Sequence, residues 1–182
     1  MNHLGMIVDL SHAGKQTCIE AIEFSNKPVA ISHANPSFFH KSIRNIDTDV
    51  LKKLAKKNGF IGLSLYPYHL KNLGECTPEE FCSMIKELIN LIGEDNIGIG
   101  SDLCLNWPDD VVMWMRNGNW TKKIDYGESK DKNPKWPKLP TWYKQPSDLK
   151  NFFTIMCENN ISEKVATKIV GENWFNFMKT QF

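Results

Sequence analysis

The chain has 182 residues, of which 41% are hydrophobic and 24% are charged, as expected for one globular domain with a sizeable core. Its 22 basic and 21 acidic residues give a net charge of +1, so the charge balance predicts neither nucleic acid nor an anionic membrane as a partner. The chain has no apolar stretch near the ~20 residues of a membrane span and no N-terminal signal-peptide pattern, so we expect neither.

Four short apolar runs lie at residues 6–10, 29–31, 60–66 and 97–100. They do not alternate with polar residues, which is typical of strands buried on both faces of a parallel sheet. Helical patterns separate them, and strand followed by helix four times over indicates an α/β fold. A complete (β/α)₈ barrel takes about 250 residues, so residues 1–182 are expected to form half of a TIM-type barrel as one partial domain with four parallel strands.

The clearest helix is expected to begin at residues 77–80. There Thr77 and Glu80 form a capping box around a proline at the first helical position. Apolar residues then recur at helical spacing until Gly93, which is a natural stop. Other helices are expected at residues 15–25, after an N-cap at Asp47 or Thr48, at 149–157 and at 165–178.

Residues 104–146 interrupt this rhythm. They hold five of the six tryptophans and five prolines, which predicts a long loop between strand and helix and argues against a disordered linker. Loops at the carboxyl end of a barrel strand are where substrates bind. The segment could bind a ligand, or it could pack as a flap over the barrel mouth, and one segment could do both.

The cysteines are scattered along the chain, and no two of them have CxxC spacing. We expect reduced thiols in packing roles, and hence a reducing, cytoplasmic compartment. A zinc site built from cysteines is not expected. The five positions are Cys18, Cys76, Cys82, Cys104 and Cys157.

Two histidines end the first two apolar runs. His12 follows the first run, His33 follows the second, and a serine precedes each of them. Carboxyl ends of neighbouring parallel strands meet at one edge, so both rings are expected to point at one metal ion, and neutral imidazole is a common zinc ligand. The alternative is a pair of hydrogen-bonded structural histidines. Asp9, within the first run, either accepts a hydrogen bond from an imidazole or pairs elsewhere.

Three further residues lie where the same edge would be. Asp102 ends the fourth run and could orient a water molecule or shuttle a proton, although an aspartate there is also a common helix N-cap. Arg44 could bind a carboxylate with two parallel hydrogen bonds, or it is an ordinary surface arginine. His69 follows the third run and has either a functional or a structural role, whereas His3 and His40 are expected to be exposed and have no assigned role.

Together these stretches resemble the C-terminal half of a membrane (renal-type) dipeptidase, peptidase family M19. The matching segments occur in the family's order and at about its spacing, and together they are highly specific. They are residues 1–12, 28–33, 44–47, 98–102 and 171–173.

The resemblance implies a (β/α)₈ barrel with two zinc ions at its carboxyl face and hydrolysis of dipeptides by a metal-activated water. It also implies that His12 and His33 hold one zinc ion. Arg44 then matches the arginine that binds the terminal carboxylate of the substrate. Asp102 matches the active-site aspartate near the scissile bond.

This chain also departs from the family. The family's other zinc ion uses a His-x-Asp pair on the first strand and a bridging glutamate, and this chain has no residues at those positions. Residues 103–106 (Leu-Cys-Leu-Asn) replace the usual Phe-Asp-Gly after the aspartate. We therefore expect a fragment with at most one partial zinc site and unpaired strand edges at both ends of its sheet. Alone it should be poorly stable and inactive.

Two other functional hypotheses stay open. The chain could be a non-catalytic half-barrel that holds a ligand or partner through residues 104–146, with structural histidines. It could also be another barrel hydrolase, such as an amidohydrolase, although the pair Arg44 and Asn45 argues against this. A dipeptidase would require its missing N-terminal half or another copy of the chain.

Overall fold

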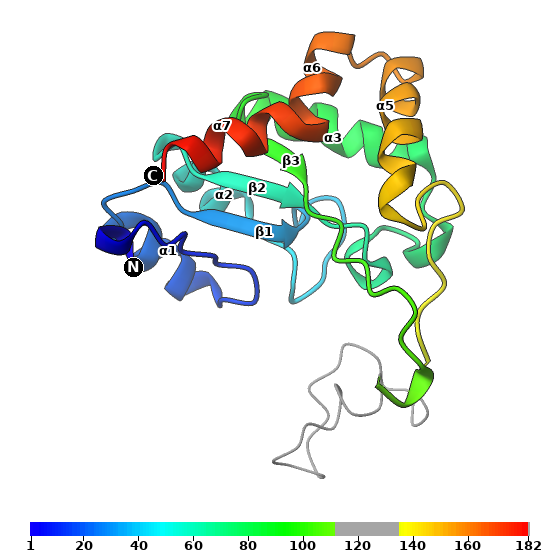
Figure 1. Ribbon diagram of the computed structural model, residues 1–182, viewed down its shortest axis with the longest axis horizontal. Helices are drawn as coiled ribbons and strands as arrows, with labels where there is room; N and C mark the ends of the chain where they lie inside the picture. Colours follow the sequence, from blue (N-terminus) through cyan, green and yellow to red (C-terminus); the bar gives the residue numbers. More distant parts are fainter. Residues whose placement is uncertain (112–134, 182) are drawn as a thin grey trace.

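The computed structural model describes residues 1–111 and 135–181. Within these residues, three parallel strands form one sheet in the order β1 (Ala30–Ala34), β2 (Phe60–Leu63) and β3 (Ile97–Ile99), so each crossover leads to the adjacent strand (Figure 1). In this register Ile31 lies opposite Ile61, and Ile61 lies opposite Ile97. The carboxyl ends of all three strands therefore lie at the same edge of the sheet, as the sequence predicted for these three runs.

The prediction of a fourth strand at residues 6–10 is wrong. This run joins β1 through a single isolated parallel bridge between Asp9 and Ala30. The Leu10 N–H donates to the Ala30 carbonyl (2.8 Å), and the Ala30 N–H donates to the Val8 carbonyl (3.0 Å). Met6 is 51% exposed, so the run lacks the apolar cover on both faces that its composition suggested. It keeps its expected place beside β1 without the regular pairing of a strand.

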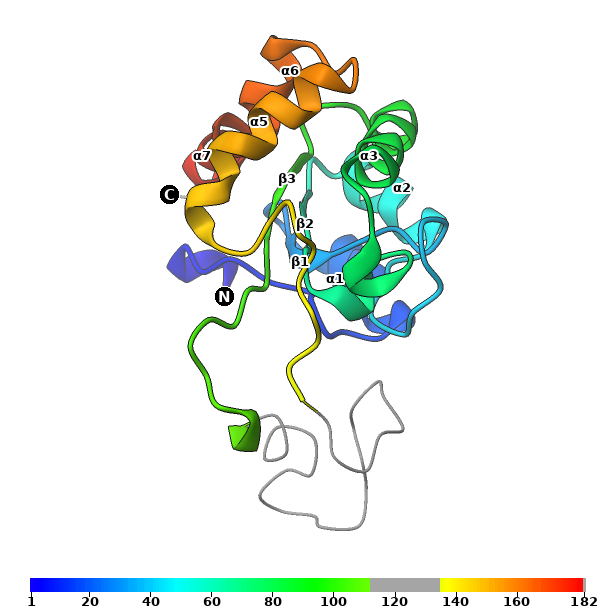
Figure 2. The same ribbon diagram turned by 90° about the vertical axis from the view of Figure 1, so that its right-hand side faces the viewer.

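Helices α1 (Lys15–Phe24), α2 (Thr48–Lys56) and α3 (Pro78–Ile92) follow the predicted segments and lie on one side of the sheet (Figure 2). The capping box of α3 is confirmed. Thr77 Oγ1 accepts from the Glu80 N–H (3.2 Å), and Glu80 Oε2 accepts from the Thr77 N–H (3.1 Å). The buried residues of α3 follow the helical spacing, so one face of the helix packs on the sheet.

The remaining elements of the described residues include 3₁₀ helices and the C-terminal helices. The 3₁₀ helices are η1 (Asn2–Leu4), η2 (Pro67–His69), η3 (Leu73–Glu75) and η4 (Pro146–Asp148). The helix expected at 149–157 is α5 (Leu149–Glu158), and the one expected at 165–178 is α6 (Glu163–Thr167), a π-helical turn η5 (Lys168–Glu172) and α7 (Asn173–Lys179). Ser162 caps α6 by accepting from the Val165 N–H at 3.4 Å.

The described ends of the Trp-rich segment show two different environments. Trp107 is 59% exposed, whereas Trp142 stacks on Phe152 with ring centroids 5.5 Å apart and donates from Nε1 to the Cys76 carbonyl (2.8 Å). Trp142 is therefore a packing residue. Most of the predicted excursion, residues 112–134, lies outside the described residues. Among the described helices we find no candidate for a membrane-spanning segment.

The outer edge of β3 is covered by side chains from α7. Asn173 Nδ2 donates to the carbonyls of Glu94 (2.7 Å) and Ile97 (2.8 Å), and Trp174 Nε1 donates to the Ile99 carbonyl (2.8 Å). Along a parallel strand, the backbone N–H and C=O groups of successive residues face opposite neighbouring strands. The Gly100 N–H pairs with β2, so the backbone groups of Ile97 and Ile99 face the outer edge. β3 is thus an edge strand of the described sheet, as expected, but two of its outward carbonyl groups accept hydrogen bonds from α7.

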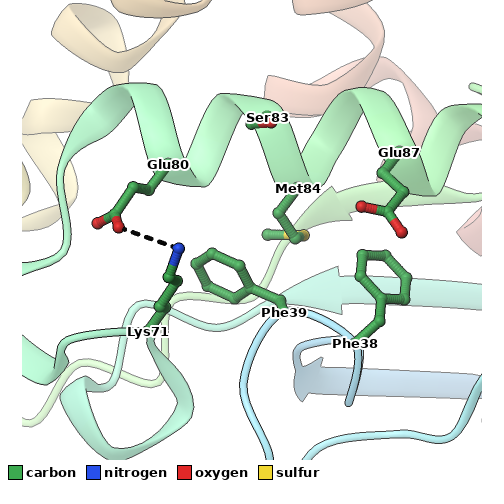
Figure 3. A pocket seen from close by; sticks show the side chains of 7 residues that line it. All are labelled: Phe38, Phe39, Lys71, Glu80, Ser83, Met84 and Glu87. Atoms are coloured by element: carbon green, nitrogen blue, oxygen red, sulfur yellow. Dashed lines mark ion pairs between the residues drawn. The ribbon is translucent and has the colours of Figure 1, made fainter.

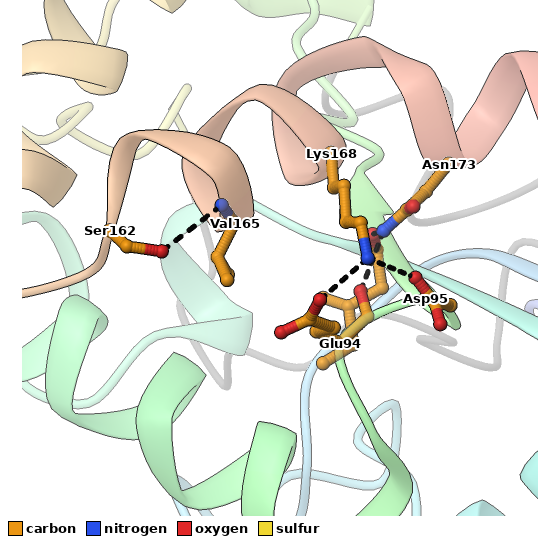
Figure 4. Close-up of polar contacts among 7 residues, drawn as sticks. Glu94, Asp95, Ser162, Val165, Lys168 and Asn173 are labelled. Carbon is orange, nitrogen blue, oxygen red and sulfur yellow. Dashed lines mark hydrogen bonds and ion pairs between the residues drawn. The ribbon is translucent and has the colours of Figure 1, made fainter.

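A salt-bridge cluster reinforces the same contact. Lys168, on the π-helical turn, pairs with Glu94 (2.5 Å) and Asp95 (2.7 Å) beside the Asn173 carboxamide (Figure 4). These two carboxylates lie in the loop that leads into β3. The hydrogen bonds that Lys168 donates to Asp95 and Glu94, together with their opposite charges, hold the pKa of Lys168 above its usual range, so the ammonium stays charged. The C-terminal helices are thus fastened to the start of β3 by both a carboxamide and an ammonium group.

We expect Asn173→Asp to destabilise the protein by about 3 kcal/mol, because it removes two donors and places a carboxylate against two backbone carbonyls in a buried site. Asn176→Asp, on the exposed face of the same helix, is the matched control and should change stability by less than about 0.5 kcal/mol. Urea unfolding of both variants measures the difference. Equal unfolding midpoints would contradict the role given to Asn173.

Candidate metal and substrate site

Two imidazoles meet at the carboxyl edge of the sheet. His33 lies in β1 and His12 follows the first apolar run, and their Nε2 atoms are 3.0 Å apart with ring centroids at 5.0 Å. His12 has a φ of 69°, in the left-handed region that a residue with a side chain rarely adopts. This backbone conformation turns the His12 ring toward His33 and carries a cost that often marks a functional site.

The distance between the two nitrogens fits a shared zinc ion. Zinc binds imidazole nitrogen at about 2.0–2.1 Å, so two nitrogens at a tetrahedral angle lie about 3.3 Å apart. The observed 3.0 Å is close to that separation. Within residues 1–111 and 135–181, no group of three or more His, Cys, Asp or Glu side chains is arranged to hold a metal. The described residues therefore offer two nitrogen ligands, which is half of a tetrahedral set.

The surroundings of His12 favour its neutral form. Partial burial lowers the pKa of His12, the charge of Arg44 lowers it further, and so does His33 whenever its ring is protonated, whereas Asp9 acts in the opposite direction. Only the neutral imidazole has a lone pair available for a metal. His12 therefore has the protonation state that metal binding requires.

Asp9 lies behind this pair without touching either ring. Its Oδ1 accepts from the backbone N–H groups of Ser11 and Ser32 (both 3.0 Å), and its Oδ2 accepts from Ser32 Oγ (2.5 Å). Partial burial raises the pKa of Asp9, but these hydrogen bonds outweigh burial and hold the pKa below its usual value. Asp9 is thus an ionised carboxylate whose hydrogen-bond partners among the described residues are serines, so of the two alternatives for Asp9 the structure favours pairing away from the imidazoles.

Asp102 and Arg44 lie at the same edge of the sheet. Asp102 follows β3 with a φ of 53°, and burial raises the pKa of its carboxyl group, although the charges of His33 and Arg44 partly oppose this. No described helix begins at Asp102, so the N-cap alternative is not supported. Arg44, in the loop between β1 and α2, is partly buried, and its charge lowers the pKa of both His12 and Asp102.

Two buried asparagines hold the surrounding loops, and the sequence analysis assigned this role to neither of them. Asn45 Oδ1 accepts from the Asn35 N–H (3.1 Å), and Asn45 Nδ2 donates to the His69 carbonyl (3.0 Å). Asn35 Nδ2 donates to the Ser64 carbonyl (2.9 Å), and its Oδ1 accepts from the Ser64 N–H (3.1 Å). The loop that carries Arg44 is thereby tied to the ends of β1 and β2. The only available signal was the position of each asparagine close to a proposed site residue.

His69 is a structural residue in this network. Its side chain is buried, and its Nδ1 lies 2.8 Å from Ser64 Oγ. Burial lowers the pKa of His69 to about 3, so the ring stays neutral. Of the two alternatives that the sequence left open for this residue, the structure favours the structural one.

Two cavities are lined by residues other than the paired histidines. The first, of about 280 Å³, lies between α3 and the loop after β1, where Phe38, Phe39 and Met84 form its apolar wall and Lys71 pairs with Glu80 at its rim (Figure 3). The second, of about 230 Å³, lies between the starts of α1 and α2. Neither is lined by His12, His33 or Asp102, so the candidate site is distinct from both cavities.

Known proteins resemble this chain in sequence and in fold. Dipeptidase tcpJ of Claviceps purpurea is 35% identical over 138 residues, which are 69% of this chain and 32% of that protein. An amidohydrolase from Pseudomonas aeruginosa, at 29% identity, superposes with a TM-score of 0.87 over 100% of this chain and 54% of its own. A metallo peptidase from Rhodobacter sphaeroides, solved with a phosphinate mimic of the dipeptide L-Ala-D-Ala, shares the fold (TM-score 0.74, 19% identity, 100% of this chain and 44% of its own).

The chain thus spans about a third of that curated relative and about half of those solved structures. The model of one family, described as membrane dipeptidase (peptidase family M19), matches residues 1–109, which include His12, His33, Arg44 and Asp102. Because this match covers more than half of the 182 residues, the chain belongs to the membrane dipeptidase family, peptidase family M19.

Proposed function

We propose that this chain is the C-terminal half of a TIM-type barrel in a zinc-dependent dipeptidase. The observation that carries the proposal is the convergence of the His12 and His33 Nε2 atoms, 3.0 Å apart, beside Asp102 and Arg44. The names of two relatives support it, because one is a dipeptidase and the other is a metallo peptidase solved with a mimic of a dipeptide. Zinc bound by the two imidazoles would act as a Lewis acid on the peptide carbonyl.

The other residues have separate roles in this proposal. Arg44 binds the terminal carboxylate of the dipeptide, since a guanidinium group presents two parallel donors to a carboxylate. Asp102, whose pKa is raised by burial, moves a proton from the attacking water to the leaving amine. His12 and His33 hold the metal in their neutral forms. The substrate is therefore fixed at its carboxylate end while the peptide bond lies over the histidine pair.

The active unit needs more than the described residues supply. Two imidazoles leave a zinc ion short of ligands, and residues 6–10 have a strand partner on one side only. Met1 and Leu4, next to this run, are also exposed. We therefore propose that the remaining half of a barrel, or another copy of the chain, packs here and completes the site. We expect the 182-residue chain alone to be inactive.

The proposal is tested on a complete protein that contains this sequence. We expect His33→Ala to lower dipeptide hydrolysis by more than about 100-fold, because it removes a metal ligand and not just a residue that supports one. His3→Ala, at an exposed position, is the control and should keep full activity. EDTA should abolish the activity, and zinc should restore it. Equal activity of the two variants would refute the assignment.

Metal analysis separates the dipeptidase from a non-catalytic binding domain. A dipeptidase should retain zinc after purification and lose thermal stability when EDTA removes the metal, because a bound metal stabilises only the folded state. A non-catalytic half-barrel with structural histidines should carry no zinc, and EDTA should leave its melting temperature unchanged.

A further inference from the structure

We infer that Asp9 sets the tautomer of His33 through the Ser32 hydroxyl, so that His33 presents an unprotonated Nε2 to the metal. The inference deepens the proposed zinc site and rests on the proposed function for its purpose, whereas the proton positions follow from the hydrogen bonds of the chain itself. Asp9 touches neither the metal site nor a substrate, so it is a positioning residue.

The argument begins with the proton of the Ser32 hydroxyl. Ser32 Oγ lies 2.5 Å from Asp9 Oδ2, and an ionised carboxylate has only acceptor atoms. The other carboxylate oxygen already accepts from the N–H groups of Ser11 and Ser32, which holds Asp9 in its charged form. The proton between the two side chains therefore belongs to Ser32, and the hydroxyl donates it to Asp9.

The other contacts of Ser32 Oγ must then be hydrogen bonds that it accepts. His33 Nδ1 lies 2.8 Å away and has to be the donor, so the proton of the neutral ring is on Nδ1. Ser11 Oγ accepts a hydrogen bond from the His33 backbone N–H at 3.0 Å. Its hydroxyl proton is therefore available, and it donates to Ser32 Oγ, 3.1 Å away. Ser32 Oγ thus donates once and accepts twice, which is its full capacity.

The consequence appears at the far side of the ring. A neutral imidazole with its proton on Nδ1 has a bare Nε2, and this atom faces His12 Nε2 at 3.0 Å. In the metal-free chain His12 must supply the proton of that contact, so it is the tautomer with its proton on Nε2. The lone pair of His33 Nε2 is therefore available to zinc without any proton transfer, whereas His12 must shift its proton from Nε2 to Nδ1.

Asp9→Asn is the decisive variant, because asparagine has the shape of aspartate but carries an NH₂ donor in place of one acceptor oxygen. While the asparagine oxygen accepts from the two backbone N–H groups, its NH₂ group faces Ser32 Oγ as a donor. The hydroxyl proton of Ser32 then turns to His33 Nδ1, and the ring proton moves to Nε2, which blocks the metal. The tautomer is read from ¹⁵N chemical shifts of the imidazole nitrogens, with His33 assigned by its loss in His33→Gln.

We expect protonated Nδ1 on His33 in the wild-type chain and protonated Nε2 in Asp9→Asn. Affinity for Zn²⁺ alone, measured by competition with a chromophoric chelator, should fall about 10- to 100-fold in the variant. Asp49→Asn removes an equal charge from an exposed position on α2 and should change neither readout. Ser32→Ala removes the hydroxyl that connects Asp9 to His33, and it should give a mixture of His33 tautomers and an intermediate zinc affinity.

Two results would overturn the inference: protonated Nε2 on His33 in the wild-type chain, or an unchanged His33 tautomer in both Asp9→Asn and Ser32→Ala. If Asp9→Asn does not fold, Ser32→Ala decides by the same spectrum. The spectrum needs neither zinc nor substrate. A protein that lacks dipeptidase activity but shows the predicted tautomers would thus refute the proposed function and still support the control of the His33 tautomer by Asp9 through Ser32.

Discussion

Acidification from pH 6.5 to pH 3 is expected to destabilise the fold by on the order of 5 kcal/mol through His69 alone. Burial lowers the pKa of His69 from 6.5 to about 3 in the folded protein, and the unfolded chain keeps the ordinary value. Below pH 6.5 the unfolded state therefore binds a proton that the folded state refuses. The stabilisation is complete above pH 6.5 and is lost as the pH falls toward 3.

Electrostatic repulsion from Arg44 acts in the same direction as burial, and His33, His12 and His40 add to it whenever their rings are protonated. These residues come from β1 and from the loops beside it, so the effect belongs to the folded arrangement and not to the local sequence. Because each pKa unit corresponds to about 1.4 kcal/mol, the pH dependence should be measurable by urea unfolding at a series of pH values.

The variant His69→Gln isolates this contribution. Glutamine does not titrate, so its free energy of unfolding should depend less steeply on pH between 6.5 and 3 than that of the wild type, whatever its absolute stability. His3→Gln, at an exposed position, should keep the wild-type slope. Parallel curves for the wild type and His69→Gln would show that His69 titrates normally in the folded protein.

The second large effect is expected from Gly100→Ala. A Cβ atom on Gly100 would lie 1.7 Å from the carbonyl oxygen of Ser32 and 3.2 Å from the carbonyl carbon of Gly62. Both neighbours are backbone atoms, so no side-chain rotation relieves the overlap. We expect a loss of about 3 kcal/mol or more, above the middle of the range for overpacked cores. The strain would fall on Ser32 and so displace His33 next to it.

Gly171→Ala is the matched control, because no atom lies within 4 Å of the Cβ it would add. Its position is helical and exposed, so alanine should be neutral or slightly stabilising. Urea unfolding compares the two variants, and zinc competition shows whether the histidine pair is disturbed. A Gly100→Ala protein as stable as Gly171→Ala would mean that the close approach of β1 and β3 is not rigid.

Features that depend on neighbouring residues could be predicted from the sequence. The start of α3 followed from Thr77 and Glu80, three residues apart, whose mutual hydrogen bonds are local. The sheet strands followed from short apolar runs whose burial on both faces leaves a compositional trace. Residues 6–10 have the same composition but only one strand neighbour, so the same rule predicted a strand where a single bridge forms.

Features that depend on distant contacts could not be predicted. Asn173 and Trp174 cover the edge of β3 from more than 70 residues away in sequence, and a carboxamide gives no local sign of the carbonyls it will meet. The same holds for Asn35 and Asn45 beneath the loop that carries Arg44. His12 and His33 could be proposed because strand ends in a parallel sheet share an edge, whereas the serine and aspartate hydrogen bonds that orient His33 required coordinates.

The covered edge of β3 makes growth of the sheet directional. A strand that pairs with β3 would first have to displace the hydrogen bonds from Asn173 and Trp174 to the carbonyls of β3. A strand that pairs with residues 6–10 would not have to displace these hydrogen bonds. Any polypeptide that extends this sheet should therefore add at the His12 side first. Under the proposed function, such a segment would arrive beside the histidine pair, so extension of the sheet and completion of the proposed metal site would be one event.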